Sequence, residues 1–140
     1  MKSFEFELQR VLLGRLDRGD DVLGALTEFC KRNGVKVGHI EAVGVVERGG
    51  VGFYDHEARV HHEIRFDEGM EIASLVGNIS GKDGETFLHC HVILADSKGR
   101  CFGGHLLGGN VAVACEFSIT VLKGAVPERT YDEATDLALW

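Results

Sequence analysis

Apolar and polar residues alternate along most of the chain, and one segment has the spacing of a helix. Phe4, Phe6 and Leu8 alternate with polar residues, which predicts a half-buried strand. Between residues 19 and 34 the apolar positions recur every three or four residues. This spacing predicts a helix with Asp20 at its N-cap and Gly34 just beyond its C-terminus.

The remaining apolar runs predict strands. Residues 35–46 are mostly apolar, which predicts a strand buried on both faces. Further strands are expected over residues 51–54, 60–66, 70–79, 87–94, 102–105 and 111–122. Because most connections are short, the fold class is α+β: a largely antiparallel mixed sheet of about seven or eight strands with one main helix packed on it.

Length, composition and charge limit the classes of protein to which the chain can belong. At 140 residues the chain is long enough for one domain, spanning 1–140, with a proper core. No apolar run reaches about 18 residues, and acidic residues stand near the N-terminus, so we expect a cytoplasmic protein with no membrane span. The formal charge of −7 argues against a broad nucleic-acid interface. Four cysteines without CxxC spacing are expected to be reduced: Cys30, Cys90, Cys101 and Cys115.

Three histidines in two neighbouring apolar runs are the main candidate for chemistry. His89 and His91 are two residues apart on a predicted strand, so their side chains point to the same face. His105 lies on the next apolar run. Zinc and other divalent transition ions commonly bind such a set of neutral imidazoles.

The turn between the two runs decides whether His105 can join the other histidines. Residues 96–100 separate the runs. A three-residue loop over 97–99, with Gly99 in the left-handed conformation, would place His91 directly opposite His105. Directly paired residues share a face and have Cβ atoms about 5 Å apart.

Two alternatives to this register stay open. A two-residue loop would place Cys90 opposite His105, and a bulge at Gly103–Gly104 would also change the pairing. Gly99 at the last loop position favours the three-residue form. In that form His89 lies on the diagonal, within reach of the other imidazoles, and Cys90 points to the opposite face as a small buried hydrophobe.

Metal binding is the preferred interpretation of the three histidines. A single histidine on an apolar strand is more often a packed residue, and a metal-free cluster is the alternative here. Three chargeable groups at close range would, however, depress one another's protonation without a metal. We therefore predict a zinc or similar ion on His89, His91 and His105. Three more histidines beside a predicted turn are expected to be solvated: His56, His61 and His62.

Glu116 is a weaker candidate, because it interrupts the apolar run 111–122 and a buried carboxylate needs a partner. If Gly108–Gly109 forms a two-residue loop, Glu116 shares the face of His105 and could orient an imidazole or act as a base. If Asn110 joins the loop, the face is reversed. The alternative is an exposed glutamate with no catalytic part.

The histidine motif and its surroundings resemble a known family. The pattern is Leu-His-Cys-His at 88–91, an Asp-x-x-Gly turn, and Gly-Gly-His-Leu-Leu at 103–107. With further similar segments at 15–22, 42–44, 71–79 and 127–129, the chain resembles the plants-and-prokaryotes-conserved (PPC) domain over nearly its whole length. The resemblance implies a largely antiparallel sheet, a homotrimer, and a metal, zinc, on the three histidines.

The family's plant members join this domain to AT-hook motifs that bind AT-rich DNA. This chain has no such hook, so DNA binding is not carried over. The plant partner-contact motif Gly-Arg-Phe-Glu-Ile-Leu would align with residues 68–73, where only Glu71 and Ile72 match.

Three functional hypotheses follow. The first is a trimeric metal-binding module that mediates binding or assembly. The second is a metal-dependent hydrolase or hydratase acting on a small-molecule ligand through a zinc-bound water, whose pKa can fall to about 7. It needs a carboxylate beside the metal, for which Glu116 is the candidate. The third is a DNA-associated regulator, which rests on family analogy alone and is opposed by the acidic charge.

Overall fold

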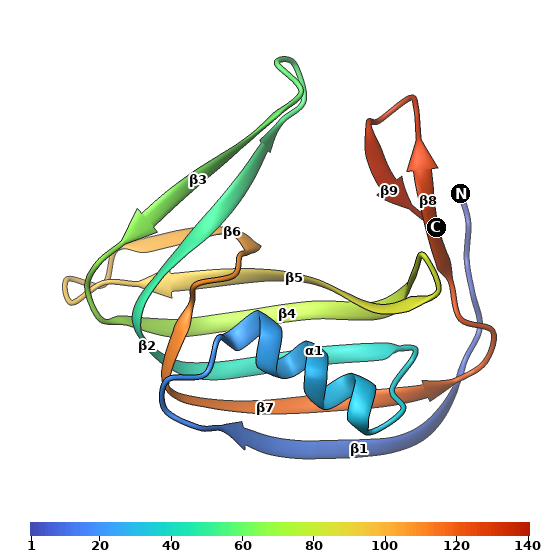
Figure 1. Cartoon of the computed structure of the whole chain (residues 1–140), viewed down its shortest axis with the longest axis horizontal. Helices are drawn as coiled ribbons and strands as arrows, with labels where there is room; N and C mark the ends of the chain where they lie inside the picture. Colours follow the sequence, from blue (N-terminus) through green and yellow to red (C-terminus); the bar gives the residue numbers. More distant parts are fainter.

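The computed structural model describes residues 1–140 as one helix and nine strands (Figure 1). In chain order they are β1 (Glu7–Leu16), α1 (Val22–Arg32), β2 (Gly38–Asp55), β3 (Val60–Phe66), β4 (Met70–Lys82), β5 (Glu85–Ala95), β6 (Cys101–Leu106), β7 (Val111–Lys123), β8 (Glu128–Asp132) and β9 (Leu137–Leu139). The predicted α+β class with one main helix is confirmed. The strand number exceeds seven or eight because the tail forms a small hairpin, β8–β9.

The sheet is organised around β2, whose 18 residues pair in two separate halves. The first half lies between β7 and β4, and the second half pairs with β3 and β6. The neighbouring pairs β4–β5 and β5–β6 are antiparallel, so the strands curl round until β6 meets the second half of β2. Register shifts near Gly44 and Val46 interrupt the ladders of β2, and such bulges bend a strand.

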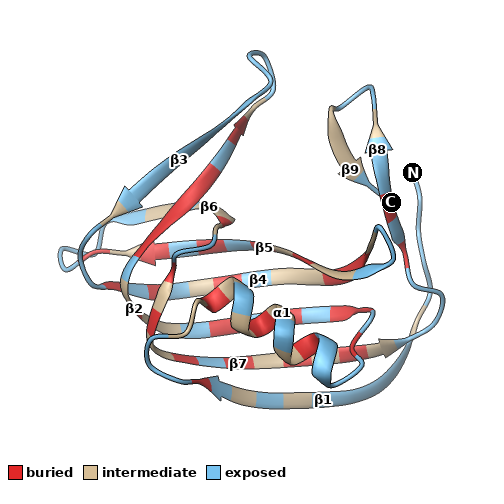
Figure 2. Ribbon diagram, viewed as in Figure 1, coloured by how far each residue is buried: buried red, intermediate tan, exposed pale blue.

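The core lies on one side of the sheet, beneath α1. Val22, Leu26 and Cys30 of α1 are fully buried and belong to the same cluster as the inward residues of the strands. On β2, Ile40 and Ala42 are buried while their neighbours are exposed, and Figure 2 shows this alternation along the strands. The predicted burial of residues 35–46 on both faces is therefore wrong, because this chain supplies only one helix to cover the sheet.

The helix begins one residue later than predicted. Asp21, not Asp20, is the N-cap, and its carboxylate accepts a hydrogen bond from the Gly24 N–H at 2.8 Å. Asp20 instead accepts from the Asp17 N–H at 2.9 Å and closes the preceding turn. Gly34 has a φ of +65°, which confirms it as the left-handed residue after the helix. With 11 residues, α1 is too short and too polar to cross a membrane.

The opposite face of the sheet carries no helix. Leu13, Val43, Val76 and Ile93 expose between 42% and 79% of their surface there. The pairings give one continuous row of residues across five strands of this face: Leu13, Ser118, Glu41, Val76 and His91. We call this surface the open face.

Two hairpins project from the sheet on one side of the molecule (Figure 1). One is the β2–β3 hairpin and the other is β8–β9. A hydrogen bond of 2.7 Å from the Tyr54 hydroxyl to the Asp136 carboxylate joins them.

Candidate metal centre

The turn between β5 and β6 has the predicted three-residue form. The Asp96 carboxylate accepts hydrogen bonds from the N–H groups of Lys98 and Arg100, each at 2.9 Å. Gly99 has a φ of +76°, and its N–H donates to the carbonyl of Asp96 at 2.9 Å. Ala95 therefore pairs with Cys101, and the register of the hairpin follows from the turn.

The ladder continues from this turn to the histidines without a shift. His91 pairs directly with His105, as predicted, so the alternatives of a two-residue loop and of a bulge at Gly103–Gly104 are wrong. Gly104 instead allows close approach of two strands, because a Cβ there would collide with the carbonyl of Gly52 on β2. His105 in turn pairs with Gly52, which places the histidines where β5, β6 and the second half of β2 meet.

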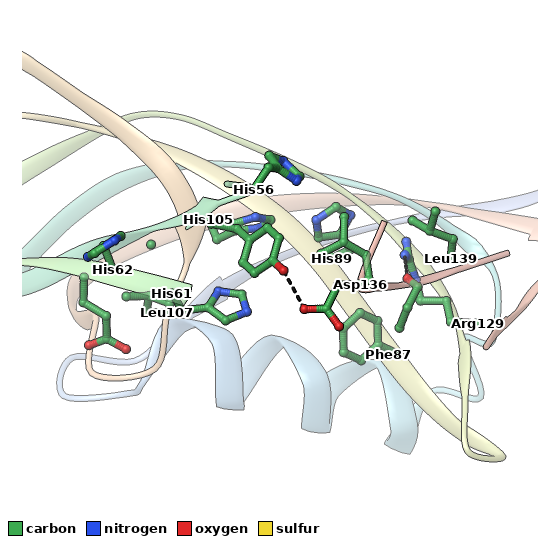
Figure 3. A pocket seen from close by; sticks show the side chains of 15 residues that line it. His56, His61, His62, Phe87, His89, His105, Leu107, Arg129, Asp136 and Leu139 are labelled. Atoms are coloured by element: carbon green, nitrogen blue, oxygen red, sulfur yellow. Dashed lines mark hydrogen bonds between the residues drawn. The ribbon is translucent and has the colours of Figure 1, made fainter. Parts of the chain in front are cut away.

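The three imidazoles lie together (Figure 3 shows two of them, His89 and His105). Their ring centroids are 5.3 Å apart for His89 and His91, 5.2 Å for His89 and His105, and 4.4 Å for His91 and His105. One nitrogen from each ring lies within 4.8 Å of the others. Tetrahedral zinc, with Zn–N distances near 2.0–2.1 Å, holds its nitrogens about 3.4 Å apart. Small side-chain rotations would reach that spacing, so the donor set fits such an ion.

Burial favours the neutral form of two of the imidazoles. His89 and His105 are half-buried, while His91 is exposed on the open face. The pKa of His89 is lowered to about 4, mainly by burial and then by the charges of Arg129 and the two other histidines. Burial, followed by His91, also lowers the pKa of His105. Both rings are therefore neutral near pH 7, which is the form that binds metals.

Cys90 lies between two of the histidines in sequence but on the other face of β5. It is 3% exposed and belongs to the core beneath α1. Burial raises the pKa of its thiol to about 12, so it stays protonated. The prediction that Cys90 is a small buried residue on the face opposite to the histidines is confirmed.

The structure does not bring Glu116 to the histidines. It lies exposed on β7, and β2 and β4 separate β7 from β5. Neither of the two loop forms considered for residues 108–110 occurs, because β7 pairs with the first half of β2 while β6 pairs with its second half. The buried amide of Asn110 accepts from the Gly50 N–H at 3.1 Å and donates to the carbonyls of Gly50 and Leu107 at 3.0 and 2.8 Å.

A cavity of about 410 Å³ adjoins the histidines, between the two projecting hairpins (Figure 3). His89 and His105 line it together with Phe87, Leu107 and Arg129. His56, His61 and His62 are exposed, as expected, yet they also line this cavity. Sequence spacing gave no signal for Arg129, because it reaches the site through the pairing of β8 with the end of β4.

Comparisons with known proteins agree with this architecture. The family model of the Plants and Prokaryotes Conserved domain, abbreviated PCC or PPC, matches residues 3–123. A crystal structure of a metal-containing protein from Archaeoglobus fulgidus is 42% identical, with a TM-score of 0.94, covering 100% of this chain and 99% of that one. A PPC protein from Pyrococcus horikoshii is 36% identical, with a TM-score of 0.92 and coverage of 100% and 96%. No curated protein matches this chain.

Proposed function

The chain belongs to the Plants and Prokaryotes Conserved domain family, and on that premise we propose that it is a metal-binding assembly module. It holds one zinc ion, or a similar divalent transition ion, on His89, His91 and His105. The observation that carries the proposal is the convergence of three imidazole nitrogens within 4.8 Å. The description of the similar Archaeoglobus fulgidus protein as metal-containing supports it.

The metal would connect two strands near the point where the sheet curls. His89 and His91 come from β5 and His105 from β6, so an ion bound by all three cross-links this hairpin. The ion also supplies positive charge and an open coordination position beside the cavity. The residues of the chain orient the imidazoles by strand pairing, and burial keeps two of them neutral.

We extend the proposal to assembly as a homotrimer through the open face. Leu13, Val43, Val76 and Ile93 are exposed apolar residues on one uncovered face of the sheet. Exposed apolar residues gathered on one uncovered face, here with Ser118 and Glu41 among them, are typical of protein–protein contacts. We do not extend the proposal to DNA, because the formal charge of −7 would repel a polyanion.

A binding module is favoured over a hydrolase because no free carboxylate adjoins the histidines. Glu116 lies on β7, and two strands, β2 and β4, lie between β7 and β5. Asp136 lines the cavity, but both of its oxygens accept hydrogen bonds from tyrosine hydroxyls, from Tyr54 at 2.7 Å and from Tyr131 at 2.8 Å.

Elemental analysis of protein purified without a histidine tag tests the metal site. We expect about one metal ion per chain in the natural protein and loss of that ion in His91→Ala and His105→Ala. His39→Ala is the matched control, because His39 is exposed on β2 and outside the cluster, and it should keep the metal. Unchanged metal content in both cluster variants would overturn the proposal.

Solution mass tests the assembly separately. A trimer has three times the 15.3 kDa mass of the chain. Val76→Glu would add a second carboxylate directly beside Glu41 on the open face and should shift the mass to that of the monomer. A natural protein that is monomeric at all concentrations would refute the trimer and leave the metal site unaffected.

A further inference from the structure

Arg129 is a buried cation without a carboxylate partner. Its side chain extends from β8, and the residue is only 7% exposed. Nε donates to the Ser80 hydroxyl at 3.0 Å, Nη1 to the Ala138 carbonyl at 2.9 Å and Nη2 to the Asn78 side-chain carbonyl at 2.9 Å. All three acceptors are neutral, and a guanidinium carries five N–H groups, so two remain free.

Aromatic rings surround this guanidinium without cancelling its charge. Its central carbon lies 4.1 Å from the Trp140 ring centroid and 5.4 Å from that of Phe87. Such contacts stabilise a cation, yet they also keep water away from it. Buried charges in proteins are normally paired, so an unpaired one beside a cavity indicates that a partner is missing from the chain.

The cation lies beside the candidate metal site. Asn78, which accepts from Arg129, is the direct cross-strand partner of His89. Arg129 and His89 line the same cavity, and Figure 3 shows them on neighbouring parts of its wall.

The two acidic residues of the cavity do not neutralise Arg129. Glu63 forms an ion pair with Arg65 at 2.7 Å. Asp136 has both oxygens occupied by tyrosine hydroxyls. None of the ion pairs of the structure includes Arg129.

The rest of the lining determines what kind of anion could enter. Phe87, Leu107, Leu137 and Leu139 give the cavity an apolar wall, and its volume of about 410 Å³ is in the range of small-molecule sites. One planar guanidinium forms paired hydrogen bonds with one carboxylate, and the apolar wall fits the organic body of such a ligand.

We propose that this cavity binds a small organic carboxylate, with its charged end against Arg129 and its apolar body against Phe87, Leu107 and Leu139. The inference deepens the proposed function, on which it rests for the metal that would lie beside the ligand. The charge recognition itself belongs to Arg129 and does not depend on the metal.

Trp140 provides the readout, because it is the only tryptophan of the chain and lies against the Arg129 guanidinium. Its fluorescence would be followed at pH 7.5 while hexanoate or hexanamide is added to the natural protein. The two probes have the same apolar chain, and only hexanoate is charged. We expect hexanoate to bind at least tenfold more tightly than hexanamide. Equal binding of the two, or no change with hexanoate at 10 mM, would overturn the proposal.

Variants test whether Arg129 is the residue that binds the carboxylate of the ligand. Arg129→Gln should weaken hexanoate at least tenfold, and the exposed Arg18→Gln, outside the cavity, should bind like the natural protein. Unchanged affinity in folded Arg129→Gln would refute the assignment. Circular dichroism shows whether this variant is folded. If it is unfolded, the affinities of hexanoate and hexanamide are compared on the natural protein and on Arg129→Lys, and equal binding of the two probes would refute the carboxylate site. Tighter binding of inorganic phosphate than of hexanoate would refute the carboxylate class.

Metal analysis of the same samples separates the two proposals. A natural protein that contains no metal but prefers hexanoate would refute the proposed function and support the carboxylate site. A protein that contains metal but shows no preference between the probes would refute the carboxylate site alone.

Discussion

His89 should make the metal-free protein sensitive to acid. Burial, together with the charges of Arg129 and the two other histidines, lowers the pKa of His89 to about 4, whereas in the unfolded chain it returns to its ordinary value of 6.5. Between these two values the unfolded chain binds a proton that the folded chain does not bind, so the free energy of unfolding falls as the pH falls. The stability is fully present above pH 6.5 and is lost progressively towards pH 4.

The size of the effect follows from the two pKa values. From pH 7 to pH 5, proton linkage gives an upper bound of about 2 kcal/mol for this residue. His89 is only partly buried, and screening by solvent reduces the expected value to about 1 kcal/mol.

Urea unfolding at pH 7 and pH 5, in EDTA and at one protein concentration, measures this loss. The natural protein is compared with His89→Gln, since glutamine is polar and does not titrate. The acid-induced loss should be smaller in His89→Gln by about 1 kcal/mol, and His62→Gln, on the exposed β3, should lose as much as the natural protein. An equal loss in His89→Gln and the natural protein would refute the reasoning, because it would mean that burial does not keep His89 neutral.

Two further predictions concern residues that support the site from the core. Cys90→Ala should lower the free energy of unfolding by about 1–3 kcal/mol in urea, since it leaves a small cavity, and should keep the metal. Loss of metal in elemental analysis would contradict the inward orientation of the thiol. Asn110→Ala should cost about 2–4 kcal/mol in the same assay, because the Gly50 N–H and the carbonyls of Gly50 and Leu107 lose their partner. A cost below about 1 kcal/mol would mean that water replaces the amide.

The histidine hairpin could be predicted from sequence because its determinants are local. Asp96 and Gly99 specify the turn through hydrogen bonds within five residues, and the pairing of His91 with His105 follows by counting along two strands. The inward orientation of Cys90 follows from the same alternation.

The position of Glu116 could not be predicted, because it depends on contacts distant in sequence. Local spacing suggested that β7 would pair with β6, but each of them pairs with a different half of β2. The bends of β2 and the amide of Asn110, which binds Gly50 from 60 residues away, produce that arrangement. Arg129 was missed for the same reason, since its place beside His89 depends on Ser80 and Asn78.

The three imidazoles lie between the open face and the cavity that contains Arg129. His91 lines a hollow of the open face with Val76 and Ile93, whereas His89 and His105 line the cavity that contains Arg129. An ion held by all three would therefore restrict side chains of both surfaces at once. If assembly uses the open face and a carboxylate uses the cavity, each should affect the affinity of the other through these rings, and by thermodynamic linkage the two effects must be equal. Hexanoate that binds trimer and monomeric Val76→Glu with the same affinity would show that the two surfaces are independent.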